Sequence, residues 1–211
     1  DLAGLKELKY EGKEGAKISD LTGLVNLTNL TVLNLQGNLI SDISALSNLT
    51  NLESLWLGDN PISDISALSN LTSLTGISFW QCKRITNITP LADLTLLTYI
   101  NLDANKLSDI TPLSKLTELW HLSLGGTGIS DLSPIANLTK VNDLRIHNNQ
   151  ISDIRPLVNL TNLKQLHLSN NQINDISPLI DNSGISGDIE LKNNPLSNTA
   201  LSTHIPALEA R

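Results

Sequence analysis

The residue types of a serine hydrolase occur in the middle of the chain, as Ser123, His121 and Asp143. In such enzymes a histidine takes the proton of the serine hydroxyl, and an aspartate orients the histidine. The sequence provides neither an oxyanion hole nor the sharp turn that exposes a nucleophile. Ser123 also follows His121 on one expected flat strand. We therefore expect no catalytic residue and no enzymatic activity.

Two other sets of residues have metal-binding side chains. His147 and His167 are two imidazoles on an open sheet, without a third ligand or supporting residues around them. An aspartate that recurs once per repeat unit cannot supply the dense oxygen cage that calcium requires, and turn capping explains it better. We expect no metal and no cofactor. The histidines are better explained as recognition residues, whose protonation would make binding pH-dependent.

Aromatic side chains are stronger candidates, for binding and not for chemistry. The chain contains three Trp, two Tyr and four His residues. Trp and Tyr combine a large rigid ring with a polar group, and they contribute strongly at recognition surfaces. Whether they share one surface depends on the elements that carry them.

Those elements are copies of a repeat of 22 residues, exemplified by LTNLTVLNLQGNLISDISALSN at 27–48. Each unit is too short to bury its own leucines, so its neighbours must cover them. In the first unit, Glu11 and Lys13 stand where strand leucines are expected. The units start at Leu5, Leu27, Leu49, Leu71 (23 residues long), Leu94, Leu116, Leu138 and Leu160, and a degraded unit starts near Asn182.

Each unit has two halves. Its L-x-L pair predicts a short strand with one buried face, and stacked copies should pair in parallel. Its I-S-D-I-S-x-L half predicts a short helical turn, with Asp as a cap and Pro in several units at the first helical position. The Asn after most strands predicts a buried column that satisfies turning backbone, in which Cys82 and Thr127 occupy two positions and still donate hydrogen bonds.

The segment 197–211 breaks the pattern that fills 1–196. It predicts a helix capped by Ser197 or Asn198, with Leu201, Ile205 and Leu208 on the face that covers the end of the core.

Side chains that alternate with the buried pair should face the concave side of the sheet in three columns. Seven of the nine Trp, Tyr and His residues lie in these columns, Trp120 adjoins them, and Gly58 and Gly125 should leave gaps. The first column is Tyr10, Val32, Ser54, Gly76, Tyr99, His121, Asp143 and Gln165; the second runs from Asn34 through Trp56 to Glu190; the third runs from Gln36 through Trp80 to Lys192. The expected ligand-binding residues are Trp56, Trp80, Tyr99, Asn101, Asp103, Trp120, His121, Asp143, Arg145, His147 and His167.

These motifs resemble the leucine-rich repeat family. The repeat length and the SDIS-x-L half are similar to the internalin-like subclass of bacterial surface proteins, and NNPLSNTALSTHIPALEAR is similar to the segment that closes many bacterial arrays. The resemblance implies an α/β solenoid: a right-handed coil with a concave parallel β-sheet, short 3-10 or helical turns on the convex side and a C-terminal helical cap. It also implies a bacterial extracellular or cell-surface location. The family's N-terminal helical cap and wall anchor are absent, so we expect a fragment of a longer chain.

The net charge and the length of the apolar runs exclude several classes of partner. The net charge of −7 and a pI near 4.9, without a basic tract, argue against nucleic acid and anionic membranes. No apolar run approaches the roughly 20 residues that span a bilayer. We expect a monomer that binds a protein ligand through the concave face. A polysaccharide stacked on the Trp and Tyr rings is the alternative, and a structural spacer is the third hypothesis.

Overall fold

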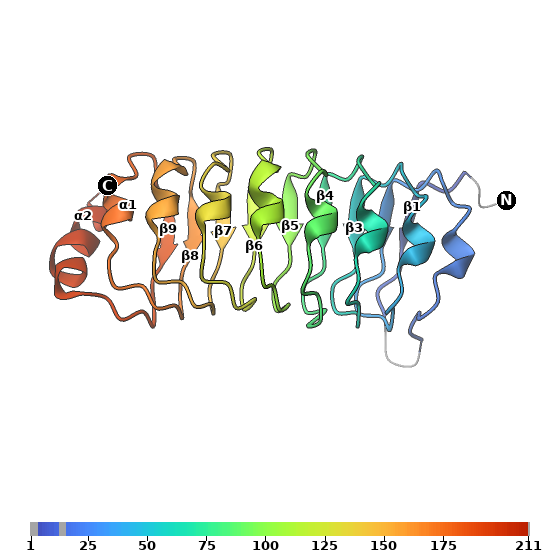
Figure 1. Ribbon diagram of the computed structural model, residues 1–211, viewed down its shortest axis with the longest axis horizontal. Helices are drawn as coiled ribbons and strands as arrows, with labels where there is room; N and C mark the ends of the chain where they lie inside the picture. Colours follow the sequence, from blue (N-terminus) through green and yellow to red (C-terminus); the bar gives the residue numbers. More distant parts are fainter. Residues whose placement is uncertain (1–3, 13–15, 211) are drawn as a thin grey trace.

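The computed structural model describes residues 4–12 and 16–210. In this part of the chain nine three-residue strands form one parallel sheet in chain order (Figure 1). Because each repeat returns to the same edge after one turn, consecutive strands pair directly. The strands are β1 (Glu7–Lys9), β2 (Val32–Asn34), β3 (Ser54–Trp56), β4 (Gly76–Ser78), β5 (Tyr99–Asn101), β6 (His121–Ser123), β7 (Asp143–Arg145), β8 (Gln165–His167) and β9 (Asp188–Glu190).

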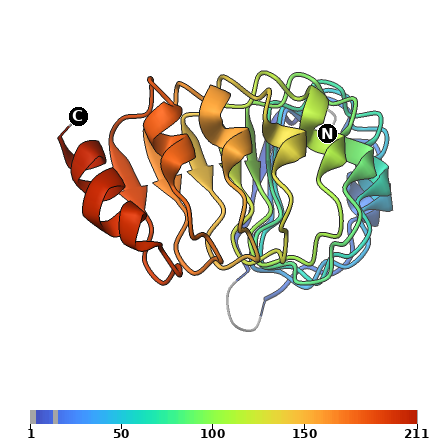
Figure 2. The ribbon, with the colours of Figure 1, turned by 60° about the vertical axis from the view of Figure 1, so that its left-hand side comes forward.

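Short helical turns stack in a second layer over the sheet, in front of the strands in Figures 1 and 2. The predicted solenoid with a parallel sheet, 3-10 turns and a C-terminal helix is confirmed. The turns are η1 (Thr22–Leu24), η2 (Ser44–Leu46), η3 (Ser66–Leu68), η4 (Thr89–Leu91), η5 (Thr111–Lys115), η6 (Ser133–Ile135), η7 (Arg155–Asn159) and the α-helix α1 (Ser177–Asp181).

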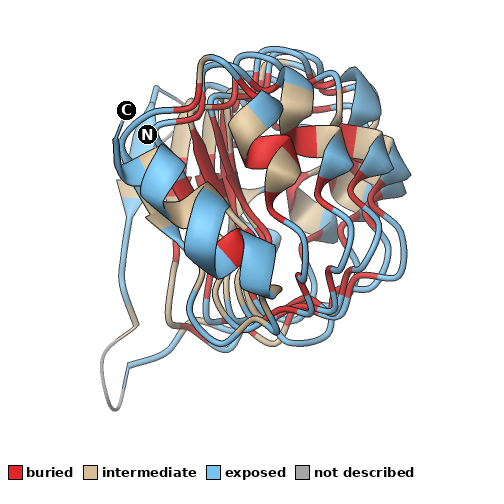
Figure 3. Ribbon diagram, turned by 90° about the vertical axis from the view of Figure 1, so that its left-hand side faces the viewer, coloured by how far each residue is buried: buried red, intermediate tan, exposed pale blue. Residues whose placement is uncertain are grey.

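The core is a continuous stack of leucine and isoleucine between these two layers (Figure 3). In one rung, Leu33 and Leu35 of the strand half meet Ile40, Ile43 and Leu46 of the turn half, all at most 2% exposed. The same positions recur in the following rungs, so each unit completes the burial of its neighbours.

Each turn is capped as the sequence predicts. Asp42 Oδ1 accepts the backbone N–H of Ser44 at 2.8 Å, and this hydrogen bond lowers the pKa of Asp42. Asn87 accepts in the same way from Thr89 at 2.9 Å. Equivalent bonds are made by Asp20, Asp64, Asp109, Asp131, Asp153 and Asp175. The aspartates are therefore turn caps.

The predicted asparagine column is also present. Asn60 donates to Leu35 O at 2.9 Å and to Leu57 O at 3.0 Å, and its Oδ1 accepts from Ile40 N at 2.9 Å. Cys82 in the next rung donates to Leu57 O at a sulfur–oxygen distance of 3.7 Å, and burial raises the pKa of its thiol to about 11. Thr127 donates to Leu124 O at 2.7 Å. The column joins backbone groups of adjacent rungs, which would otherwise be buried without partners.

The predicted register of the first unit is wrong. Glu7 pairs with Val32, so the first step is three residues longer than 22, and Tyr10 does not belong to the first column. This register places Leu8 against the core, whereas the predicted one would place Glu11 there, and an unpaired buried carboxylate is costly. Tyr10 instead donates its hydroxyl to Ala16 O at 2.5 Å. Lys13 lies outside the described residues.

The C-terminal segment is helical, as a π-helix η8 (Ala200–His204) followed by α2 (Ile205–Glu209). Ser197 Oγ accepts from Ala200 N at 3.1 Å, as its predicted capping role requires. Leu201 is 54% exposed, contrary to the prediction, and Ala200 is buried in its place. The π-turn shifts the helix phase before Pro206, which explains the change of buried residue. In the described residues no helix has the length and apolar character needed to cross a membrane.

Candidate functional site

The concave face, defined as the solvent-facing columns of the sheet, carries a contiguous aromatic cluster of Trp56, Tyr99, Trp120 and His121. The Tyr99 and His121 rings are stacked, with centroids 4.2 Å apart and planes 4° apart. Trp56 meets Tyr99 edge-on at 5.3 Å, and Trp120 meets Tyr99 at 6.0 Å. Trp120, just before β6, remains 45% exposed. Residues distant in sequence thus form one ring surface across β3 to β6.

Glycines decide where the indoles lie. An ideal Cβ on Gly58 would stand 2.1 Å from Trp80 Cδ1, so the Trp80 ring fills the space above Gly58. The Nε1–H of Trp80 donates to Gln36 Oε1 at 3.2 Å, two rungs away. Trp56 leans the other way over Gly76, whose ideal Cβ would stand 3.6 Å from Trp56 Cη2. The predicted gap at Gly58 is therefore filled by an indole, because a bare backbone is the surface that admits a flat ring.

The ring of His121 is fixed by an acid and an arginine. His121 Nδ1 lies 2.8 Å from Asp143 Oδ2, and Arg145 donates from Nε to Asp143 Oδ1 and from Nη2 to Asp143 Oδ2, each at 3.0 Å. The His121 and Asp143 side chains are 6% and 11% exposed, whereas that of Arg145 is 42% exposed. The network therefore presents one guanidinium to solvent in a fixed orientation.

Burial and charge shift the pKa values in this network. Desolvation lowers the pKa of His121 and outweighs the opposing effect of Asp143, so the imidazole is neutral near pH 7 and donates from Nδ1. Burial alone would raise the pKa of Asp143, but the hydrogen bonds and charges of Arg145 and His121 hold it below its ordinary value. The hydrogen bond to Asp143 raises the pKa of Arg145.

Ser123, the third residue type of a hydrolase triad, belongs to a different group. Its hydroxyl donates to Asp103 Oδ1 at 2.7 Å, and Gly125 N donates to the same oxygen at 2.6 Å. Asn101 Oδ1 accepts from Asp103 N at 3.0 Å. The proton of Ser123 is therefore directed to Asp103 and not to His121, so Ser123, His121 and Asp143 do not form the hydrogen-bond chain of a triad.

The remaining histidines of the predicted site lie apart from the cluster. His147 covers Gly125, where an ideal Cβ would stand 2.4 Å from His147 Cε1, so the second predicted gap is also filled. His167 Nδ1 lies 3.1 Å from Glu190 Oε2. Within residues 4–12 and 16–210, three or more His, Cys, Asp or Glu side chains nowhere gather as a metal-binding group.

All eleven predicted site residues can thus be placed. Trp56, Tyr99, Trp120, His121, Asp143 and Arg145 form one connected surface, whereas Trp80, Asn101, Asp103, His147 and His167 make separate local contacts. Gln36, which fixes Trp80, was not predicted as a site residue. Its place in the third column was the available signal, but the distance over two rungs depends on how the indole leans.

Comparisons with known proteins place these features in context. The family model described as leucine-rich repeats (2 copies) matches residues 28–70, 50–93 and 140–181. A search of curated proteins finds no match. Among solved structures, internalin C2 from Listeria monocytogenes is 38% identical over 93% of this chain and 82% of that chain, with a TM-score of 0.83.

Two further structures share the fold. The functional domain of InlJ from Listeria monocytogenes, described as including a cysteine ladder, is 27% identical over 92% of this chain and 40% of that chain, with a TM-score of 0.77. The ectodomain of the plant receptor kinase GASSHO1/SCHENGEN3 from Arabidopsis thaliana, in complex with CASPARIAN STRIP INTEGRITY FACTOR 2, is 25% identical over 91% of this chain and 24% of that chain, with a TM-score of 0.73.

Proposed function

Because this chain belongs to the internalin-like leucine-rich repeat family, we propose that it is a non-enzymatic recognition module that binds a protein ligand through the concave face. The observation that carries the proposal is the aromatic cluster, in which Trp56, Tyr99, Trp120 and His121 contact one another across four strands. Aromatic residues and arginine are enriched among the residues that contribute most to protein binding.

The cluster is prearranged for binding. Tyr99 is held between the edge of Trp56 and the stacked ring of His121, and Arg145 is held by two hydrogen bonds to Asp143. Side chains ordered before binding lose less conformational entropy in the complex, so more of the contact free energy appears as affinity. We assign Trp56, Tyr99 and Trp120 as apolar anchors and Arg145 as the polar contact beside them.

The relatives support a binding role. The Arabidopsis ectodomain of this fold is solved in complex with CASPARIAN STRIP INTEGRITY FACTOR 2, and leucine-rich repeat solenoids generally provide extended concave binding surfaces. By its likeness to internalin C2, we propose a bacterial extracellular or cell-surface location for this chain, and a monomer as the binding unit.

Polysaccharide binding is the second candidate, and the setting of Trp80 favours it. Its partly exposed indole lies over Gly58 with Nε1 already bonded to Gln36, which leaves ring surface for stacking and no free indole donor. Sugar rings stack on such surfaces, and Asp103 one rung from Trp80 and His147 three rungs from it have groups suited to hydroxyls.

The test compares the wild-type chain with a Trp56→Ala/Trp120→Ala variant and a Leu96→Ala control. Leu96 is a 53% exposed apolar residue outside the concave columns. Each protein is immobilised and used to capture proteins from bacterial and host-cell extracts, and each is titrated with a polysaccharide panel by tryptophan fluorescence.

We expect that the wild type and Leu96→Ala both capture the same protein. The double variant should bind this protein with an affinity lower by at least about thirtyfold, because it lacks two anchors. Saturable quenching by a glycan that is lost in Trp80→Ala, with no captured protein, would replace the protein ligand by a polysaccharide. A captured protein that binds all three proteins equally would refute the aromatic cluster as its binding site.

A further inference from the structure

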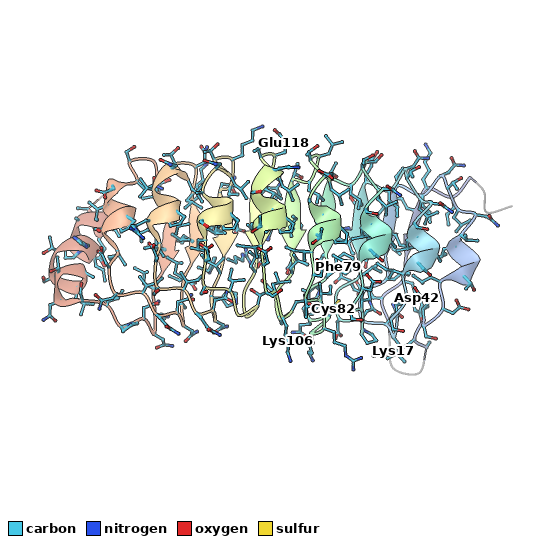
Figure 4. All side chains as sticks on the ribbon, in the orientation of Figure 1. Lys17, Asp42, Phe79, Cys82, Lys106 and Glu118 are labelled. Atoms are coloured by element: carbon cyan, nitrogen blue, oxygen red, sulfur yellow. The ribbon has the colours of Figure 1, made fainter. Side chains whose placement is uncertain are left out.

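A second surface lies along the edge of the solenoid that is lowest in Figure 4, where the chain leaves the sheet and the asparagine column binds the turning backbone. A hollow of about 280 Å³ opens there over the first four rungs. Its floor includes Asn38, Asn60 and Cys82 of the column. Figure 4 shows Lys17, Cys82 and Lys106 along this edge, below the layer of turns. This edge hollow is separate from the concave columns.

The edge hollow is basic in an acidic protein. Lys17, Lys83 and Arg84 line it, against a single lining carboxylate, Asp59, whereas the whole chain carries −7. Lys106 follows one rung beyond Arg84, since its N–H bonds to Ile85 O at 3.0 Å. Within the described residues these four exposed cations form no ion pair, although other surface cations such as Lys140 do. Unneutralised like charges gathered on one surface favour an anionic partner.

An insertion creates the densest part of this charge. The step from Ser78 to Asn101 is 23 residues, and the extra residue lies between Cys82 and Ile85. Lys83 takes a left-handed backbone, with φ of 65°, at a position where the neighbouring rungs have no such residue. Left-handed conformations are disfavoured in residues other than glycine, so Lys83 marks a local irregularity of this rung. The irregularity places two adjacent cations, Lys83 and Arg84, where other rungs carry one residue.

The spacing and the intervening residues indicate the form of the ligand. Lys17, Leu39, Pro61 and Arg84 occupy equivalent positions in four successive rungs, each just before an isoleucine that lies in the core or packs against it. At about 4.8 Å per rung, Lys17 and Arg84 are roughly 14 Å apart, which is about four residues of an extended peptide. Between them, Leu39 is 54% exposed and Pro61 is partly exposed, so the middle of the hollow is apolar.

We propose that the edge hollow binds an extended acidic segment of a protein partner, with acidic side chains at Lys17 and at Lys83–Arg84 and an apolar side chain between them on Leu39 and Pro61. A densely charged polysaccharide would place negative charges against the apolar centre and beside the carboxylate of Asp59, and both contacts are unfavourable. A peptide can place an apolar side chain there, so the apolar centre and Asp59 favour a peptide.

The probe is the fluorescein-labelled peptide Gly-Glu-Glu-Gly-Leu-Gly-Glu-Glu-Gly, measured by fluorescence anisotropy in low salt. A peptide with Gln in place of each Glu and another with Ser in place of Leu are the matched probes. We expect binding of the acidic peptide, weakening as salt is added, and at least a tenfold loss with either matched probe. Absence of binding, or tighter binding of a sulfated polysaccharide that displaces the peptide, would overturn the proposal.

Two variants locate the site. Lys83→Gln/Arg84→Gln should weaken binding of the peptide at least tenfold. Lys115→Gln/Lys140→Gln removes the same charge from two lysines that do not line the hollow and that pair with Asp93 and Glu118, and should change the affinity less than twofold. Lys83→Gly removes one cation and relieves the left-handed strain, so we expect weaker binding with an unchanged or higher Tm. Equal losses in both double variants would show that net charge alone attracts the peptide, and would refute the hollow as its site.

Discussion

Gly58→Ala tests the geometry of the concave face directly. The added Cβ would stand 2.1 Å from Trp80 Cδ1 and 2.2 Å from Nε1. Because non-bonded carbon atoms pack at about 3.5 Å, the indole must move by about 1.4 Å or adopt another rotamer. Either change breaks the hydrogen bond from Trp80 Nε1 to Gln36.

The free energy of unfolding should nevertheless change little. Loss of the Gln36 bond costs about 0.5–1.5 kcal/mol, and alanine in place of glycine in extended backbone returns roughly 0.5–1 kcal/mol. The difference is within about 1 kcal/mol, so urea unfolding should be nearly unchanged. We therefore expect the Trp80 ring to move while the free energy of unfolding stays nearly constant.

The assay is the NMR resonance of the Trp80 indole N–H together with acrylamide quenching of fluorescence. Gly58→Ala should shift the Trp80 resonance and increase quenching. Gly76→Ala is the matched control, because its Cβ would meet Trp56 Cη2 at 3.6 Å, an ordinary contact. An unshifted Trp80 resonance in Gly58→Ala, or an equal shift in both variants, would show that glycine does not set the position of the ring.

Two further predictions concern stability. Asn60→Ala leaves Ile40 N without its acceptor and removes one donor from Leu57 O. We therefore expect the free energy of unfolding in urea to fall by about 3 kcal/mol, against about 1 kcal/mol for Cys82→Ala, which loses a single weak hydrogen bond. Equal losses in the two variants would contradict this ranking. The pKa of His121 is lowered by burial, so the unfolded chain binds this proton more readily and the free energy of unfolding should fall as the pH drops below the unfolded value of about 6.5. Tm measured from pH 7 to 5 should fall less in His121→Gln, and parallel curves for the two proteins would contradict the burial of His121.

The sequence was sufficient for the architecture because one pattern is repeated with few errors. Each unit has a leucine pair with period two and an aspartate-capped turn, and this pattern can bury its apolar residues in only one way. Because the pattern recurs, every unit predicts the same strand register with its neighbour. The prediction was wrong in the first unit, where Leu8 and not Glu11 packs against the core and the step to the next strand is three residues longer. It was also wrong at Leu201, because a π-turn is not visible in the helical period.

On the concave face, too, the sequence determined some features and the tertiary structure determined others. Alternation along each strand determined that Trp56, Tyr99, His121 and Asp143 share one surface, since this depends only on backbone geometry and the repeat period. The direction of each ring depends on neighbours in other rungs: Trp80 lies over Gly58, and Tyr99 stacks on His121. Likewise, the commitment of the Ser123 hydroxyl to Asp103 follows from side-chain packing between rungs. Residue type and spacing thus set which side chains lie on the concave face. Their contacts and their exposure arise only when the rungs stack, because the rotamer of each side chain depends on its neighbours in other rungs.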